Sequence, residues 1–187
     1  MADLNQLYSD HQLSLMRARA EMLLSRQRWP DAAVMAQRAL SADAGKNPIM
    51  AAATNRILGL AWLRGGKRDA GQKKCEEALA AAQSLKDPRM LLDARMAVLE
   101  ARLAAHDSAG ATGLFHDLEP ALKIHPESRW RALAMMAGLD RQYLPRASEA
   151  LRELAARWGE ARYQQYLTRR DIQKLSWPLL HTDSARH

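Results

Sequence analysis

The sequence predicts an all-α protein, and three observations lead to this class. Alanine, leucine, arginine and methionine are abundant, whereas the chain holds one Phe, four Tyr and few β-branched residues, a balance that favours helix over strand. The apolar residues recur at intervals of three and four, which is the helical period. Prolines and a Gly-Gly pair stand between these periodic stretches, where helices start or stop. With 187 residues and 48% hydrophobic content, the chain can bury a core of about one domain.

An apolar stripe and a proline indicate the first two helices. Residues 1–10 are polar, and we expect this N-terminal segment to be flexible. A first helix that ends near Arg28 is predicted by a stripe made of Leu13, Met16, Ala20, Leu23 and Leu24. Pro30 suits the opening turn of the second helix, because the N–H that proline lacks has no intrahelical partner there in any case.

Further prolines mark the later helices. Asn47-Pro48 and Asp87-Pro88 each place a capping side chain before a proline at the first helical position, so a hairpin is predicted to begin at each. Pro126 and Pro145 also stand where helices are expected to start. Pro120 is the exception, because it falls inside the helical pattern from Ser108 to Ile124 and removes a backbone donor. We expect it to kink or divide that helix near Leu118.

The stretch Ile57–Leu79 describes two helices and the turn between them. Gly65-Gly66 breaks the helical pattern. Gly59 on the first helix and Gly71 on the second remove side-chain bulk where the two helices meet, and Trp62 fills the space beside them. The pattern predicts an antiparallel hairpin with a close crossing.

The same order returns along the chain at an irregular period. A small residue opens the second helix of each predicted hairpin, with separations of 39, 40 and 36 residues, at Ala32, Gly71, Ala111 and Ala147. Together with the Leu-Gly, aromatic and Gly positions of the stretch Ile57–Leu79, this order resembles the tetratricopeptide repeat (TPR), whose usual period is about 34 residues. Cys75 departs from the repeat by standing where an aromatic residue is usual. The resemblance implies a right-handed α-solenoid of about four antiparallel helical hairpins.

This TPR-like reading sets the expected boundaries. The repeat domain is predicted to span residues 11–158. Because a solenoid needs its ends covered, residues 159–177 are predicted to form C-terminal capping helices, with a disordered tail at 178–187. The string Tyr166–Leu175 is similar to tails that follow such repeats in bacterial multidomain signalling proteins.

A search for reactive groups yields no motif, so we expect a protein that is not an enzyme. None of the six His forms an HxxxH pair or lies near a Cys at metal-ligand spacing, and we expect neither a metal nor a cofactor. His116 could face Glu119, although a solvated helical His is the plainer interpretation. Cys75 faces the hairpin interior, which favours a small buried hydrophobe over a nucleophile. Gly65-Gly66-Lys67 lacks the other parts of a phosphate-binding loop and is read as a hairpin turn.

Cysteine usage and hydropathy suggest a location. One Cys allows no intramolecular disulfide, and neither a signal peptide nor a run of eighteen apolar residues occurs. We therefore expect a cytoplasmic protein that does not act at a membrane.

The TPR resemblance implies a function in protein–protein interaction. Repeats of this family present a concave groove, lined by the first helix of each pair, to a peptide or helix of a partner. By the pattern, the groove residues here are Arg17, Glu21, Leu24, Arg56, Leu60, Arg64, Met96, Glu100, Leu103, Arg129 and Met136. Arg17 and Arg56 occupy equivalent places in successive hairpins, so they could clamp an acidic segment. The chain would then be a scaffold or adaptor, acting alone or within a larger assembly.

The basic charge keeps a second hypothesis open. The net charge is +7, with the excess at the two ends of the chain. Such a balance is compatible with an ordinary soluble surface. The weaker alternative to a protein-interaction module is nucleic acid bound through its phosphate backbone on a basic solenoid. The repeats lack the regular pair of polar positions that base-reading repeat proteins need, so only backbone-driven binding is considered.

Overall fold

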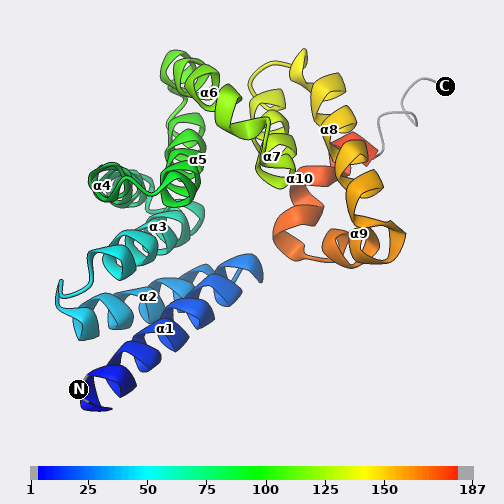
Figure 1. Cartoon of the computed structure of the whole chain (residues 1–187). Coiled ribbons are helices and arrows are strands. Elements are labelled where there is room, and N and C mark those ends of the chain that lie inside the picture. The colour runs from blue at the N-terminus through cyan, green and yellow to red at the C-terminus, as the bar shows by residue number, and fades with distance from the viewer. Residues whose placement is uncertain (1–3, 181–187) are drawn as a thin grey trace. The chain divides into compact units, whose positions relative to one another are not determined.

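The computed structural model describes the backbone of residues 4–180 and the side chains of residues 11–180 (Figure 1). Within that part of the chain every regular element is a helix, and no strand occurs, so the all-α class is confirmed. In order, the helices are α1 (Leu4–Ser25), α2 (Trp29–Asp43), α3 (Pro48–Arg64), α4 (Arg68–Leu85), α5 (Pro88–Ala104), α6 (Ser108–Leu122), α7 (Pro126–Ala137), α8 (Tyr143–Trp158), α9 (Glu160–Leu167) and α10 (Arg170–Leu180).

The chain divides into two compact units, Met1–Ala105 and His106–His187. The first unit holds α1–α5 and the second holds α6–α10. The predicted repeat domain, residues 11–158, spans this division and stays a prediction. Since α5 and α6 belong to different units, the third of the four predicted hairpins is not confirmed, and the solenoid remains an expectation.

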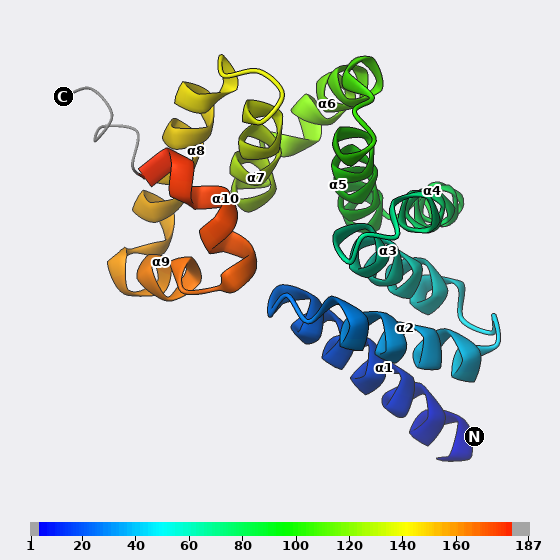
Figure 2. The same cartoon turned by 180° about the vertical axis from the view of Figure 1, so that it is seen from behind.

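In the first unit each helix packs against the next one along the chain (Figures 1 and 2). In addition, α3 contacts both α1 and α5. The first helices of the predicted hairpins therefore form a continuous row, α1, α3 and α5, which is the arrangement that a groove across these helices requires.

The closest helix contact in this unit lies between α3 and α4, at two glycines. A Cβ atom on Gly59 would lie 2.8 Å from the backbone nitrogen of Cys75, and one on Gly71 would lie 2.5 Å from the backbone nitrogen of Leu63. At Gly59 the new atom would also lie 2.7 Å from Cys75 Sγ, and at Gly71 its three nearest neighbours are all backbone atoms, so at both positions a side chain would meet backbone that cannot move aside. The predicted close crossing between Gly59 and Gly71 is confirmed.

The predicted capping side chains start two helices of this unit. Asn47 Oδ1 accepts a hydrogen bond from the Met50 backbone N–H at 3.0 Å, and Asp87 Oδ1 accepts one from Met90 at 2.8 Å. Pro48 and Pro88 follow as the first helical residues. These bonds satisfy donors that have no partner inside the helix.

Of the two outcomes predicted for Pro120, a division of its helix is wrong, and a kink near Leu118 stays a prediction. α6 runs without a break from Ser108 to Leu122 with Pro120 in its last turn. Proline removes one hydrogen bond there, but Phe115, Leu118 and Leu122 on the same face are buried. Their packing holds the helix together, because most helical stability in proteins comes from burial of an apolar face.

In the second unit α7 and α8 pack as a hairpin, and α10 contacts α7, α8 and α9. The indole of Trp130 is fully buried, and its Nε1 donates to the hydroxyl of Tyr166 at 3.2 Å. Trp158 packs edge-on against the same tyrosine, with ring centroids 5.1 Å apart. Two short helices, α9 and α10, follow α8, and α9 packs on the α7–α8 hairpin through this aromatic cluster. That they cap a repeat array stays a prediction.

The terminal segments differ from the predicted boundaries. α10 continues through Pro178 to Leu180, so the prediction of disorder is wrong for residues 178–180, and residues 181–187 lie outside the described part. Leu179 explains the extension, because it is buried. At the other end α1 begins at Leu4, inside the segment 1–10 that was expected to be flexible.

None of the helices within residues 4–180 has both the length and the apolar character needed to span a bilayer.

Candidate functional site

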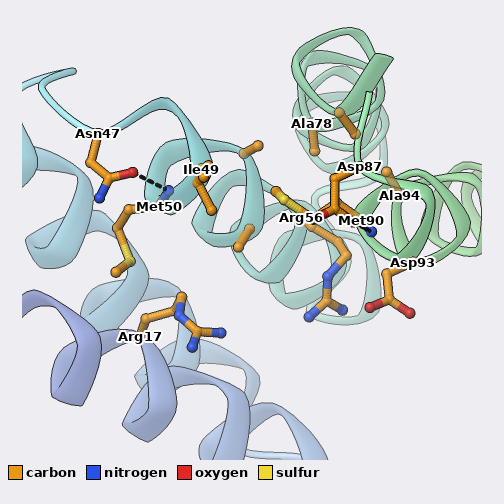
Figure 3. Close-up of a pocket in the computed structure, with 13 residues that line it drawn as sticks. Arg17, Asn47, Ile49, Met50, Arg56, Ala78, Asp87, Met90, Asp93 and Ala94 are labelled. Carbon is orange, nitrogen blue, oxygen red and sulfur yellow. Dashed lines mark hydrogen bonds between the residues drawn. The ribbon is translucent and has the colours of Figure 1, made fainter. Parts of the chain in front are cut away.

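The first unit contains a groove of about 330 Å³ across its row of helices (Figure 3). The groove is open to solvent and draws residues from α1, α3, α4 and α5 and from the two capping positions. Its lining residues are Arg17, Asn47, Ile49, Met50, Ala52, Ala53, Arg56, Ala78, Ala82, Asp87, Met90, Asp93 and Ala94. Its volume is at the small end of the range of ligand-binding cavities, roughly 300–1,000 Å³.

Helical spacing and small side chains create the groove. Ile49, Ala53 and Arg56 lie at intervals of four and three residues on α3, so they share one face. The floor is made of alanines, of which Ala78 and Ala82 on α4 are 1% exposed. Because alanine has no atoms beyond Cβ, space remains above it that longer side chains would fill.

Apolar side chains stand above this floor. Ile49 is 58% exposed, and Met50 and Met90 are half-buried. Methionine is flexible and polarisable, so it adapts to the shape of an apolar ligand. The three side chains give the groove an apolar surface that is accessible from solvent.

Two arginines supply positive charge on one side of the groove. Arg56 Nη2 donates to Glu21 Oε2 at 2.6 Å, and its side chain is 19% exposed. Arg17, on α1, is half-buried and forms no ion pair within the part of the chain that the structure describes. Of the two, Arg17 is therefore the guanidinium available to a ligand.

Two aspartates supply negative charge from α5 and its cap. Asp87 is exposed and uses Oδ1 to cap the helix. Asp93 is half-buried, and its Oδ2 accepts a hydrogen bond from Arg89 Nε at 3.2 Å. The groove thus carries both signs of charge around an apolar centre.

The predicted groove residues fall into four groups, of which three are accessible or half-buried and one is buried. Arg17 and Arg56 line the groove, and Glu21 is joined to it through Arg56. Arg64 and Glu100 lie outside the lining and form a bidentate ion pair between α3 and α5, with distances of 2.6 and 2.7 Å. The remaining half-buried members, which also lie outside the lining, are Met96, Leu103 and Arg129. Arg129 belongs to the second unit and donates to Glu153 Oε2 at 2.7 Å.

Three predicted groove residues are corrected by their burial. Leu24 is 4% exposed, Leu60 is 6% exposed and Met136 is fully buried. The contacts of α3 with α1 and α5 cover the flanks of the row, so Leu24 and Leu60 pack inside the unit. Of the adjacent pair Met135 and Met136, only Met135 keeps partial exposure.

Sequence reasoning missed the beginnings of α3 and α5, from the cap of α5 to its second turn, which supply Ile49, Met50, Asp87, Met90 and Asp93. The Gly and aromatic positions of the repeat stand in the later part of each helix, so the pattern carries no information on the residues that begin it. A usable signal was present, because Ile49 and Ala53 stand on the same helical face as Arg56. Two ion pairs that join helices of the first unit were also detectable, as opposite charges 35 and 36 residues apart: Glu21 with Arg56 and Arg64 with Glu100.

The thiol and imidazole groups outside the groove lie in surroundings that do not indicate a reactive site. Cys75 is fully buried, and burial raises the pKa of its thiol to about 12, so the thiolate form is suppressed at neutral pH. His116 Nδ1 lies 3.5 Å from Glu119 Oε2 on an exposed face of α6. Among residues 11–180 no group of three or more His, Cys, Asp or Glu side chains is placed to hold a metal ion. The arrangement of the groove is suited to binding through charge and apolar contact.

Comparisons of this chain with protein-family models, with curated proteins and with solved structures gave no match. The resemblance to the TPR therefore rests on the residues of the chain itself, and the case for function rests on the groove.

Proposed function

We propose that this chain is a non-enzymatic protein-interaction module that binds a segment of a partner protein in the groove of its first unit. The observation that carries the proposal is the groove itself. It is open, its apolar side chains are accessible, and Arg17 stands beside it without an ion pair in the described structure. Apolar anchors with a few convergent polar groups are the usual composition of a binding site.

A peptide suits this groove better than a nucleic acid. Backbone-driven binding of nucleic acid needs a surface of one positive sign. Here Asp87 and Asp93 line the same groove as Arg17, and Arg56 is neutralised by Glu21. The mixed charge and the methionines favour a polypeptide, which offers both apolar and charged side chains.

The proposal is tested with a displayed library of random peptides selected on the full chain. Ala53 lines the groove and is half-buried, so Ala53→Trp places an indole in the binding space. Ala80 is exposed on α4 and outside the groove, which makes Ala80→Trp the matched control. We expect selected peptides to lose about tenfold or more in affinity for Ala53→Trp, which corresponds to about 1.4 kcal/mol, and none for Ala80→Trp.

Two results would contradict the proposal. The first is a failure to enrich any peptide. The second is equal binding of the enriched peptides to Ala53→Trp and to the unchanged protein, which places them on another surface. If a homopolymeric nucleic acid binds tightly, with an affinity that falls steeply with salt and is unaffected by Ala53→Trp, the phosphate-binding hypothesis replaces this one.

A further inference from the structure

The charges of the groove are separated along the row of helices. Arg17 rises from α1 on one side, and Asp93 is carried by α5 on the other, with Arg56 of α3 between them (Figure 3). Asp87 caps the N-terminus of α5, so both carboxylates belong to the α5 side. The row therefore has a basic end at α1 and an acidic end at α5.

The basic end has a donor suited to a carboxylate. A guanidinium offers N–H groups in a planar fork that matches the two oxygens of a carboxylate. Arg56 uses Nη2 for Glu21, whereas Arg17 is not engaged by any charged side chain of the described structure. A ligand carboxylate would therefore find its partner at Arg17.

The acidic end repels a ligand that carries negative charge only. Asp87 and Asp93 lie in the same groove, and within the described residues Asp93 is paired only with the exposed side chain of Arg89 at 3.2 Å. Like charges brought together at an interface oppose binding and select against wrong partners. A cationic side chain removes this repulsion and gains an attractive contact. Between the two ends, Met50 and Met90 and the alanine floor accept an apolar side chain.

We propose that the groove recognises a bipolar peptide segment, in which an acidic residue lies at Arg17, an apolar residue lies over the alanine floor, and a basic residue lies towards Asp87 and Asp93. This inference rests on the proposed function and adds the order of charges to it. The separation of charge sets the direction of the bound segment, because reversing the segment would place each charge beside its own sign.

The test uses one peptide selected on the full chain and a set of charge variants. Arg17→Glu changes the basic end, and Arg19→Glu, an exposed position on the same helix outside the groove, is its control. Asp93→Lys changes the acidic end, and Asp117→Lys, exposed on α6 in the other unit, is its control. The affinity of the peptide is measured for each variant.

We expect Arg17→Glu and Asp93→Lys each to weaken binding by about tenfold, and the two controls to leave it unchanged. A peptide whose acidic residue is replaced by lysine should regain affinity for Arg17→Glu. A peptide whose basic residue is replaced by glutamate should regain affinity for Asp93→Lys. This restoration separates direct recognition from misfolding, because a misfolded variant does not gain affinity for a changed ligand.

The outcomes distinguish this inference from the proposed function. If Ala53→Trp abolishes peptide binding but neither Arg17→Glu nor Asp93→Lys changes the affinity, the peptides bind in the groove and the order of charges does not contribute to recognition. If Arg17→Glu alone has an effect and Asp93→Lys has none, the ligand is a simple acidic segment and the bipolar model is overturned. If Ala53→Trp has no effect on any peptide, the proposed function itself fails.

Discussion

At the scale of single residues, the glycines of α3 and α4 show how a missing side chain can determine helix packing. Gly59 faces the sulfur and the backbone nitrogen of Cys75, and Gly71 faces the backbone of Leu63. Backbone atoms are fixed by the hydrogen bonds of their helix, so they cannot move aside as the end of a long side chain can. This contact decides how near α4 lies to α3, and α4 in turn supplies Ala78 and Ala82 to the floor of the groove.

Replacing Gly59 with alanine should therefore destabilise the protein although alanine favours helix. The new Cβ would lie 2.8 Å from the nitrogen of Cys75, and overpacking of this kind costs about 1–3 kcal/mol. Gly113 is the matched control, because it is helical and a Cβ there meets nothing within 4 Å. Gly113→Ala should gain about 0.5–1 kcal/mol. Urea unfolding monitored by circular dichroism measures both, and equal midpoints would refute the assignment.

A second prediction at this scale concerns Glu119 on α6. Arg146 Nη2 donates to Glu119 Oε1 at 2.6 Å, and this hydrogen bond, with a smaller effect of His116, lowers the pKa of the carboxyl against the opposing effect of burial. A depressed pKa in the folded state means that the carboxylate stabilises the protein above the pKa of the unfolded chain. The contribution is lost as the pH falls through the folded value.

Glu119→Gln should thus reduce the free energy of unfolding at pH 7, and by less once the pH is below the depressed pKa. The side chain is 35% exposed, so solvent screening limits the difference to under about 1 kcal/mol. The comparison is made by denaturant unfolding of the unchanged protein and of Glu119→Gln, each at pH 7 and at a pH below the depressed pKa of Glu119. A difference that grows on acidification would show that the carboxylate is not stabilised in the folded state.

At the scale of helices, the capping residues explain why the N-termini of some helices could be predicted from the sequence. Asn47 and Asp87 each stand before a proline and do accept the expected hydrogen bond. His125 also precedes a proline, Pro126, but gives no side-chain bond to its helix. The helix nevertheless starts there, since proline fixes the backbone dihedral φ without help from a cap.

Asn47→Ala should cost about 1 kcal/mol, because the Met50 N–H loses its partner. His125→Ala is the control at the equivalent position of α7 and should change stability by less than about 0.5 kcal/mol. Thermal unfolding of the two variants in parallel tests the difference. Equal losses would mean that the bond to Met50 contributes nothing beyond what water supplies.

Local patterns predicted the helices better than they predicted exposure. Caps, prolines and the Gly-Gly turn act over a few residues, so they can be read from one segment. The burial of Leu60 depends on how α1 and α5 lie against α3, and no single segment contains that information. The same limit explains why Met50 and Met90 were not among the predicted groove residues, whereas Arg17 and Arg56, which were, do line the groove of the first unit; their role in binding a partner stays a prediction.

At the scale of the whole molecule, the division after Ala105 changes how the protein should behave. The repeat pattern treats the chain as one array, whereas the structure separates it into Met1–Ala105 and His106–His187. The groove and all of its lining residues lie in the first unit. Sequence periodicity could not reveal this division, because helices at regular spacing can belong to one array or to two.

The first unit should fold without the second. Its five helices pack on one another through α1·α2, α2·α3, α3·α4 and α4·α5, with α3 joining α1 and α5. Its core includes Ile57, Leu58 and Leu99, each at most 2% exposed, and at about 100 residues it is long enough for a domain.

Residues 1–105 expressed alone should therefore give a helical circular dichroism spectrum and a cooperative melt. They should also bind the peptides selected on the full chain, within about threefold of its affinity, a difference of about 0.7 kcal/mol. Gly59→Ala in this shortened chain is the control, since it should lower the melting temperature by disturbing the same α3·α4 contact. A shortened chain that is unfolded would show that the first unit depends on the second. A folded chain that has lost the peptides would show that the groove is not the whole site.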